Sequence, residues 1–502
     1  MRRSIQVILL FIIIAVLVYY LNNSFGNTIA TILSISTSLG VIFVSIIIFL
    51  ENRHPSSTLA WFLVLALNPV AGFFFYILFG QNYRKRKIYD RKALRDAEAY
   101  SLIDNQSMAD KNKLEQFSDS QRQLFRLAQK VARSPLSFHS ETEILTNGEV
   151  AFAAILEELK KAVHHIHMEY YIYRDDRIGT EIKQILMDKA RSGVEVRFMY
   201  DDVGSLKLPN VFLDEMRAAG IEVVAFSPVY FPLLSNKVNY RNHRKIIVID
   251  GKVGFTGGLN VGDEYLGRSQ TYGFWRDTHM LIRGEAVRTL QTIFLQDWLY
   301  MTGKAYLSPE YLSPQLLDNH QDGAVQIISS GPDNEWKTVK NLFFSMISSA
   351  RKSIWIATPY FIPDEDIYTA LKVASLSGVD VKLLFPKKPD KWIPFLASHS
   401  YFSEMMSAGV KIYEYEKGFL HAKVLIIDGE MASVGTANMD MRSFHLNFEV
   451  NAFIYRTSST QQLINDYKAD LKDSTQIDED QFSRRSLVRF FESAARLLSP
   501  LL

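Results

Sequence analysis

The chain has 502 residues, of which 22% are charged and 48% hydrophobic, and its formal net charge is +2. This length allows two or three domains, and the nearly balanced charge does not indicate a nucleic-acid-binding protein. The sequence contains no cysteine, which excludes disulfides, thiolate zinc sites and cysteine nucleophiles.

Three uncharged apolar segments occupy most of the first 80 residues, at residues 5–21, 28–50 and 59–79. Because about 20 apolar residues cross a bilayer core, the first two are predicted to be transmembrane helices. The first could also be a secretory signal, but no small-residue cleavage site follows it, which favours an uncleaved anchor. The third contains Asn68-Pro69, and proline removes a helix hydrogen bond. It is interpreted as a re-entrant or interfacial hairpin, with a third crossing as the alternative.

Basic residues flank this membrane region of residues 1–80, at Arg2, Arg3 and in the run from residue 84 to residue 92. Positive charge is retained on the inner side of a membrane, so an even number of crossings is predicted. The run either contacts anionic lipid headgroups or is only the flank that stops translocation. Residues 81–140 are predicted to form a basic juxtamembrane and helical linker.

Beyond residue 140, strand and helix patterns alternate, as expected of an α/β domain. The pattern is repeated, because Ser192-Gly-Val-Glu-Val-Arg197 matches Ser377-Gly-Val-Asp-Val-Lys382, and residues 215–223 match residues 404–412. The match indicates a duplication into two lobes, residues 141–325 and 326–482, each with a mixed β-sheet flanked by helices.

The third repeated pair is a polar motif within residues 243–260 and 421–438. His243-Arg-Lys-Ile-Ile-Val-Ile-Asp250 matches His421-Ala-Lys-Val-Leu-Ile-Ile-Asp428, and an asparagine, Asn260 or Asn438, follows each histidine by 17 residues. Strand periodicity places His243 with Lys245, and His421 with Lys423, on one face. Asp-Gly between apolar runs is a hairpin signal, so Asp250 and Asp428 are interpreted as holding the turn more than touching substrate.

A pair of imidazoles facing one phosphodiester can divide the work of a displacement between them. One histidine attacks phosphorus and the other protonates the leaving alcohol, while lysine and asparagine donors stabilise the phosphate oxygens. No clustered carboxylates of the kind that hold magnesium are apparent, so no metal or other cofactor is expected.

The duplicated motif resembles that of the phospholipase D superfamily, and the longer flanks resemble bacterial cardiolipin synthases. The segments that carry the resemblance are Asn239-Tyr-Arg-Asn-His-Arg-Lys245, Thr256-Gly-Gly-Leu-Asn-Val-Gly-Asp-Glu-Tyr265, Gly435-Thr-Ala-Asn-Met-Asp-Met-Arg-Ser-Phe-His-Leu-Asn-Phe-Glu449 and Pro55-Ser-Ser-Thr-Leu-Ala-Trp61. The resemblance implies two phospholipase D-type lobes after an N-terminal transmembrane region, in a multi-pass protein of the bacterial cell membrane. The basic run that precedes the lobes predicts that they lie on the cytoplasmic side.

The resemblance further implies that a phosphatidyl group moves from one phosphatidylglycerol to a second through a phosphohistidine, giving cardiolipin and glycerol. It implies a catalytic set of His243, Lys245, Asp250, His421, Lys423 and Asp428, with Asn260 and Asn438 binding phosphate. His243 is taken as the nucleophile and His421 as general acid and then base, with the reverse assignment as the alternative. A carboxylate after each motif, Asp277 and Glu449, would orient its histidine. The partners expected are phosphatidylglycerol, cardiolipin and the bilayer, with no nucleic acid.

Two apolar loops, residues 229–234 and 392–396, precede the motifs and either line the access route for acyl chains or pack as ordinary core. Residues 483–502 place leucine and phenylalanine on one helical face flanked by arginines, a pattern typical of an interfacial membrane helix, with packing against a lobe as the alternative.

The motif does not separate transfer to an alcohol from hydrolysis by a phospholipase D. A non-enzymatic scaffold is disfavoured by two intact motifs. The sequence does not indicate the acyl-chain preference or the oligomeric state.

Overall fold

The computed structural model describes residues 38–51, 55–76, 111–229, 239–313, 323–479 and 486–501, together with residues 31–32, 35–36, 80, 92, 317 and 482. The chain forms two compact units. The N-terminal unit comprises residues 1–87 with 231–236, and the main unit comprises residues 88–230 with 237–502. The predicted transmembrane segment at residues 5–21, the basic run at residues 84–87 and most of the apolar loop at residues 229–234 lie outside the described residues.

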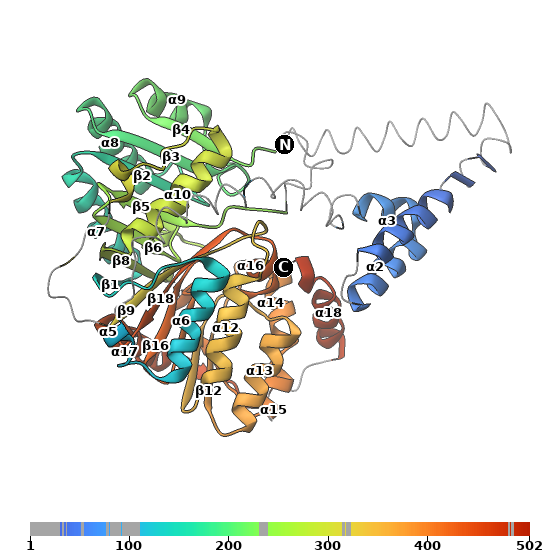
Figure 1. Cartoon of the computed structure of the whole chain (residues 1–502). Helices are drawn as coiled ribbons and strands as arrows, with labels where there is room; N and C mark the ends of the chain where they lie inside the picture. The colour runs from blue at the N-terminus through green and yellow to red at the C-terminus, as the bar shows by residue number, and fades with distance from the viewer. Residues whose placement is uncertain are drawn as a thin grey trace. The chain divides into compact units, whose positions relative to one another are not determined.

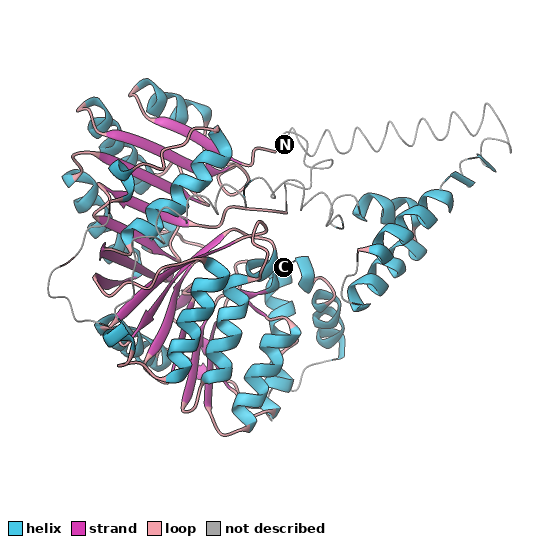
Figure 2. Ribbon diagram, in the orientation of Figure 1, coloured by secondary structure: helices cyan, strands magenta, loops and turns pink. Residues whose placement is uncertain are grey.

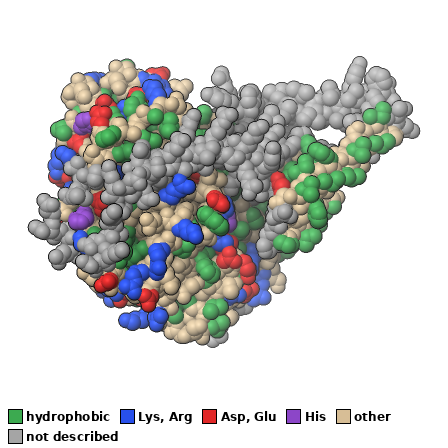
Figure 3. All heavy atoms as spheres, in the orientation of Figure 1, with side chains coloured by type: hydrophobic (Ala, Val, Ile, Leu, Met, Phe, Trp, Pro, Cys, Tyr) green, Lys and Arg blue, Asp and Glu red, His purple; other side chains and the backbone are tan. Residues whose placement is uncertain are grey.

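The described part of the N-terminal unit is helical. Residues 38–50 form one helix, followed by α2 (Pro55–Leu67) and α3 (Pro69–Phe75). The helices break at Asn68, whose side chain accepts the N–H of Ala71 at 3.0 Å and caps α3. In the part of the chain that the structure describes, no helix is long and apolar enough to cross a membrane. Hydrophobic side chains nevertheless gather on the surface of this unit (Figure 3).

The first lobe of the main unit is built on a seven-stranded mixed sheet (Figure 1). The three strands at one edge of this sheet, the last three in the order given next, run parallel to one another, and all other neighbouring strands are antiparallel. In spatial order the strands are β1 (Ser140–Thr146), β8 (Thr278–Gly284), β6 (Val253–Gly257), β5 (Lys245–Ile249), β2 (His165–Tyr170), β3 (Glu195–Asp201) and β4 (Glu222–Phe226).

The second lobe repeats this plan in an eight-stranded sheet. Its strands β10 (Ser353–Ala357), β12 (Asp380–Pro386) and β13 (Lys411–Tyr415) are parallel, like β2, β3 and β4 of the first lobe. Both sheets are mixed and flanked by helices, which confirms the fold class and the duplication. In spatial order the strands are β19 (Ser474–Gln476), β13 (Lys411–Tyr415), β12 (Asp380–Pro386), β10 (Ser353–Ala357), β15 (Val424–Ile427), β16 (Met431–Gly435), β18 (Glu449–Tyr455) and β9 (Ala324–Ser330).

Helices cover both sheets, and the repeated Ser-Gly-Val segments mark where two of them end. Gly193 follows α8 (Arg177–Arg191) with φ of +95°, and Gly378 follows α13 (Glu365–Leu376) with φ of +93°. Glycine adopts this left-handed conformation without steric cost. The helices are α5 (Lys111–Leu114), α6 (Asp119–Ala132), α7 (Asn147–Lys161), α8 (Arg177–Arg191), α9 (Asn210–Ala218), η3 (Asp263–Leu266), α10 (Val287–Thr302), α11 (Pro309–Leu312), α12 (Thr338–Ser349), α13 (Glu365–Leu376), α14 (Trp392–His399), α15 (Phe402–Ser407), α16 (Met441–His445), α17 (Ser458–Lys472), α18 (Ser486–Arg496) and η4 (Ser499–Leu501).

The segment expected to be a linker contributes to the second lobe. Helix α6 lies beside α12 over one face of the second sheet (Figure 2). Its residues Leu124, Phe125 and Ala128 are buried in the same core as Leu342 of α12. This spacing of three and four residues is that of an amphipathic helix, so α6 belongs to the lobe and residues 119–132 are more than a connection.

Candidate active site

The two polar motifs occupy equivalent hairpins, one in each lobe. In the first, Lys245 opens β5, which pairs with β6; in the second, Lys423 directly precedes β15, which pairs with β16. His243 and His421 lie two residues ahead of these lysines, at the ends of the strands that point toward the other lobe. The expected hairpins are therefore present, and the histidine ends of both converge.

The motif aspartates lie at the opposite ends of the strands, in the turns. Asp250 and Asp428 adopt left-handed φ values of +54° and +55°. Each carboxylate accepts three successive backbone N–H groups, from residues 163–165 in one lobe and 351–353 in the other, at 2.7–3.3 Å. They hold the strand-opening loops and do not line the cleft described below. This is the turn-holding position expected for both aspartates, and their inclusion in the catalytic set stays a prediction.

Backbone pairing across the lobes brings each histidine beside a carboxylate of the other lobe. Strands β7 (Phe274–Arg276) and β14 (Gly418–Leu420) run parallel, and the N–H of His421 donates to the carbonyl of Arg276 at 2.7 Å. In the equivalent contact of the other dyad, the N–H of His243 donates to the carbonyl of Phe448 at 2.9 Å. The next residue along each partner strand is Asp277 or Glu449.

The resulting dyads are reciprocal. His243 of the first lobe contacts Glu449 of the second, with Nδ1 to Oε2 at 2.9 Å. His421 of the second lobe contacts Asp277 of the first, with Nδ1 to Oδ2 at 2.7 Å. The sequence indicated these two carboxylates but paired each with the histidine of its own motif; the structure exchanges them. An ionised carboxylate only accepts hydrogen bonds, so each Nδ1 carries the hydrogen and Nε2 is left for the reaction.

Burial sets the charge state of these groups. Burial lowers the pKa of both His243 and His421 to about 4, although the facing carboxylates act in the opposite direction. Burial would raise the pKa of Glu449, but His243 and Lys245 outweigh it and bring that pKa to about 2. The pKa of Asp277 is likewise lowered, by His421 and Lys423 against burial. At neutral pH the free site therefore holds neutral imidazoles and ionised carboxylates.

Each motif lysine is buried and held against the backbone of its own histidine. The Nζ of Lys245 donates to the carbonyl of His243 at 2.7 Å, and Lys423 makes the same bond to the carbonyl of His421. Burial lowers the pKa of Lys245 to about 7 and that of Lys423 to about 8. A bound phosphate anion would restore both ammonium charges, because an opposite charge favours the ionised form.

A cleft of about 920 Å³ joins the two halves of the site. Both histidines and both motif asparagines line it, so the structure brings these predicted residues together. The Oδ1 of Asn438 is buried and has no hydrogen-bond partner among the described residues, whereas the Oδ1 of Asn260 accepts the N–H of Ile172 at 3.1 Å. An unpaired polar atom in a cleft indicates a place for a ligand group.

The sequence analysis did not predict several other residues of the cleft. Arg174, Tyr360, Asp390 and Arg442 all line the walls. Arg442 lies inside the Met-Asp-Met-Arg flank of the second motif, which could have pointed to it. No sequence motif surrounds Arg174, Tyr360 or Asp390. They reach the cleft from loops whose positions depend on the packing of the lobes.

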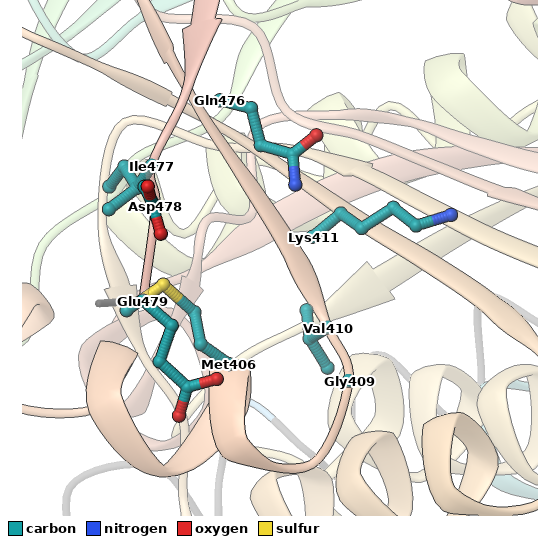
Figure 4. Close-up of a pocket in the computed structure, with 8 residues that line it drawn as sticks. All are labelled: Met406, Gly409, Val410, Lys411, Gln476, Ile477, Asp478 and Glu479. Atoms are coloured by element: carbon teal, nitrogen blue, oxygen red, sulfur yellow. The ribbon is translucent and has the colours of Figure 1, made fainter. Parts of the chain in front are cut away.

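The apolar segment at residues 392–396 is a helix, α14, and not the expected loop. Trp392, Ile393 and Pro394 line the cleft, as predicted for an access route. Phe395 instead packs against the core of the second lobe, with its ring centroid 4.0 Å from that of His399. A second hollow lies away from both histidines, at the edge of the second sheet (Figure 4). It is lined by Met406, Gly409, Val410, Lys411, Gln476, Ile477, Asp478 and Glu479, and includes no residue of the motifs.

Comparison with known proteins identifies both lobes and the N-terminal unit. A family described as "Cardiolipin synthase, PLD-like domain" matches residues 155–298 and 343–471, and one described as "Phospholipase_D-nuclease N-terminal" matches residues 39–81. Proteins named cardiolipin synthase from Geobacillus sp. (strain WCH70) and Geobacillus thermodenitrificans (strain NG80-2) are 55% and 56% identical, over the full length of both chains. The solved structure of phosphatidylserine synthase from Haemophilus influenzae Rd KW20 aligns with a TM-score of 0.56 at 14% identity, over 76% of this chain and all of that one.

Proposed function

The chain belongs to the cardiolipin synthase family built on the phospholipase D-like domain, and from this premise we propose that it condenses two phosphatidylglycerol molecules into cardiolipin and glycerol. The observation that carries the proposal is the pair of reciprocal histidine–carboxylate dyads in one cleft. Two imidazoles with free Nε2 atoms suit a double displacement at phosphorus.

In the first half-reaction, the Nε2 of His243 attacks the phosphorus of one phosphatidylglycerol. The bond from phosphorus to the headgroup glycerol breaks, and protonated His421 gives its Nε2 proton to the departing oxygen. Glycerol leaves, and the phosphatidyl group stays on His243. The ammonium groups of Lys245 and Lys423 balance the charge that grows on the phosphate oxygens during this step.

In the second half-reaction, the terminal glycerol hydroxyl of another phosphatidylglycerol attacks the same phosphorus. Now neutral, His421 takes the proton of that hydroxyl, and the bond from phosphorus to His243 breaks. Cardiolipin is released and His243 is again neutral, while His421 holds the proton taken from the hydroxyl and gives it to water once the phosphate has left. The cycle therefore balances without any other co-reactant.

The division of roles between the two histidines is part of this proposal. Burial lowers the pKa of both His243 and His421 to about 4, and each histidine faces a carboxylate that raises its pKa and a motif lysine that lowers it. A bound phosphodiester anion would raise the pKa of His421 and supply the acid form.

We further propose that the N-terminal unit anchors the enzyme in the bacterial cell membrane with the lobes on the cytoplasmic side. The exposed apolar side chains of this unit support the anchoring, since Leu59, Leu63 and Leu67 are 62–78% exposed. The basic residues that flank the apolar segments support the sidedness.

The test is an incubation of the purified full-length protein with labelled phosphatidylglycerol. We expect cardiolipin and glycerol from the wild type, and neither from His243→Ala or His421→Ala. His164→Ala is the matched control, because this half-exposed histidine of the first lobe lies outside the cleft. Phosphatidic acid as the only product would assign hydrolysis instead, and full activity in both active-site variants would refute the site.

A further inference from the structure

Helices α14 and α18 form one surface at the edge of the second lobe. They pack side by side (Figure 1), and one face of α18 is fixed to the lobe. Ala495 is buried in the core, and the guanidinium of Arg496 lies 4.4 Å from the ring centroid of Tyr401. The hydroxyl of Ser499 lies 3.2 Å from that of the same tyrosine. The C-terminal helix is therefore a docked part of the main unit.

The opposite face of α18 exposes large apolar side chains. Leu487 is 68% exposed and Phe490 67%, and Leu497 in the turn that follows the helix is 83% exposed. On α14, Trp392 is 70% exposed and Ile393 50%. Residues of these types are normally buried, and a contiguous exposed group of them marks an interaction surface. We call this surface the apolar rim; its members are Trp392, Ile393, Leu487, Phe490, Phe491 and Leu497.

The apolar rim is continuous with the cleft. Trp392 and Ile393 at the start of α14 line the same cleft as His243 and His421. A molecule that covers the rim therefore also borders the opening that leads to both histidines.

The charges on this surface select an anionic occupant. The only acidic residue of α18, Glu492, is 5% exposed, so its carboxylate is turned away from solvent. Arg489 of α18 and Lys391, which precedes α14, are exposed. The surface thus presents aromatic and aliphatic groups with basic residues, the combination that lies in the headgroup region of a bilayer.

We propose that the apolar rim inserts into the surface of an anionic lipid bilayer and holds the cleft at the level of the lipid headgroups. The inference rests on the proposed function, because it takes the substrate to be a bilayer lipid. A phospholipid then moves laterally from the bilayer into the cleft, passing Trp392 and Ile393, without exposing its acyl chains to water. Lipids dissolved as single molecules do not need the rim.

The absence of cysteine makes a direct test possible, since one introduced thiol is the only labelling site. Leu487→Cys places an environment-sensitive fluorophore on the rim, and Leu376→Cys is the matched control, at a leucine of α13 that is 72% exposed. Full-length protein reconstituted at low density in phosphatidylglycerol vesicles should show blue-shifted emission, quenched by spin-labelled lipid, only for the label at position 487. Emission at 487 like that at 376 would overturn the proposal. A blue shift that depends on protein concentration and resists lipid quenching would assign the rim to a second copy of the chain.

Kinetics give a second, independent readout. The double substitution Phe490→Ser with Phe491→Ser should lower turnover of long-chain phosphatidylglycerol in vesicles by about tenfold, through lost interfacial insertion. Turnover of dispersed dihexanoyl phosphatidylglycerol should stay unchanged, and Leu376→Ser should alter neither. Equal losses on both substrates would refute docking and indicate a packing role. If the wild type makes no cardiolipin from either lipid, the proposed function fails, while the fluorescence result still decides whether the rim meets a bilayer.

Discussion

Replacing Glu449 by glutamine tests the exchanged pairing of histidines and carboxylates. The side chain is completely buried and accepts hydrogen bonds from His243 at 2.9 Å and Asn447 at 3.1 Å, as well as from Thr436. Glutamine keeps the volume and one acceptor but removes the negative charge. The imidazole of His243 then loses the group that fixes its tautomer and stabilises the positive charge that it gains when it bonds to phosphorus.

The size of the effect follows from the electrostatics of the dyad. The pKa of Glu449 is lowered from 4.5 to about 2 by its cationic and hydrogen-bonding neighbours, against the effect of burial. At 1.36 kcal/mol per pKa unit, this corresponds to about 3 kcal/mol of net stabilisation of the charged carboxylate by His243, Lys245 and Thr436 together. If most of that stabilisation is lost in the transition state, formation of the phosphohistidine slows by about two powers of ten.

An activated substrate separates Glu449 from Asp277. In a phosphatidyl ester of p-nitrophenol, the leaving group departs without a proton, so the first step no longer needs the acid, His421. The rate of p-nitrophenol release in a single turnover should then fall about 100-fold in Glu449→Gln but only slightly in Asp277→Asn, because Asp277 acts through His421. With phosphatidylglycerol, both variants should be slow.

The opposite pattern would refute the reasoning. If Asp277→Asn slows p-nitrophenol release and Glu449→Gln does not, either the dyads pair within each lobe or His421 is the nucleophile. Trapping the phosphatidyl group on its histidine and sequencing the labelled peptide distinguishes these two cases.

Three further predictions concern the groups around the dyads. Burial lowers the pKa of Lys245 to about 7 and that of Lys423 to about 8. Because both lysines then lose their charge as pH rises, kcat/KM should fall between about pH 7 and pH 9. A kcat/KM that stays constant over this range would exclude a role for the lysine charges. Asp428→Ala should lower the free energy of unfolding by about 1–2 kcal/mol, since three backbone N–H groups lose their acceptor. The kcat of this variant should fall less than about tenfold, and a loss as large as that of His421→Ala would show a direct catalytic role for this aspartate. Gly258→Ala would place a Cβ 2.0 Å from the Oδ1 of Asp277, so cardiolipin synthesis should fall at least as far as in Asp277→Asn, and wild-type activity would contradict the geometry.

Local sequence patterns predicted the features that depend on short stretches of chain. The two hairpins, the mixed sheets and the duplication follow from strand periodicity and from turn residues at fixed spacing. The exchange of Asp277 and Glu449 does not, because it depends on the register of β7 against β14 and of Asn242 against Phe448, pairs that are far apart in the sequence.

Helix α14 shows a different limit of the sequence reasoning. The sequence analysis predicted a loop at residues 392–396, but the helix cap is Lys391, so Pro394 is the third helical residue of α14. The first N–H groups of a helix have no partner within it, and a proline there costs little. The position of a proline relative to the start of a helix, rather than its presence, decides whether the helix can form.

The reciprocal dyads also bear on how the substrate reaches the site. Neither lobe contains a complete dyad, so catalysis requires both lobes in register. The buried ion pair of Arg276 with Asp470, at 2.8 Å, and the bond from Nε of Arg244 to the carbonyl of Glu449, at 3.2 Å, hold that register from either side. A shift of 1 Å between the lobes would break both hydrogen bonds to the histidines, since such bonds weaken steeply with distance. Substrate therefore has to enter and leave through the mouth of the cleft while the lobes stay closed, and that mouth is where the apolar rim begins.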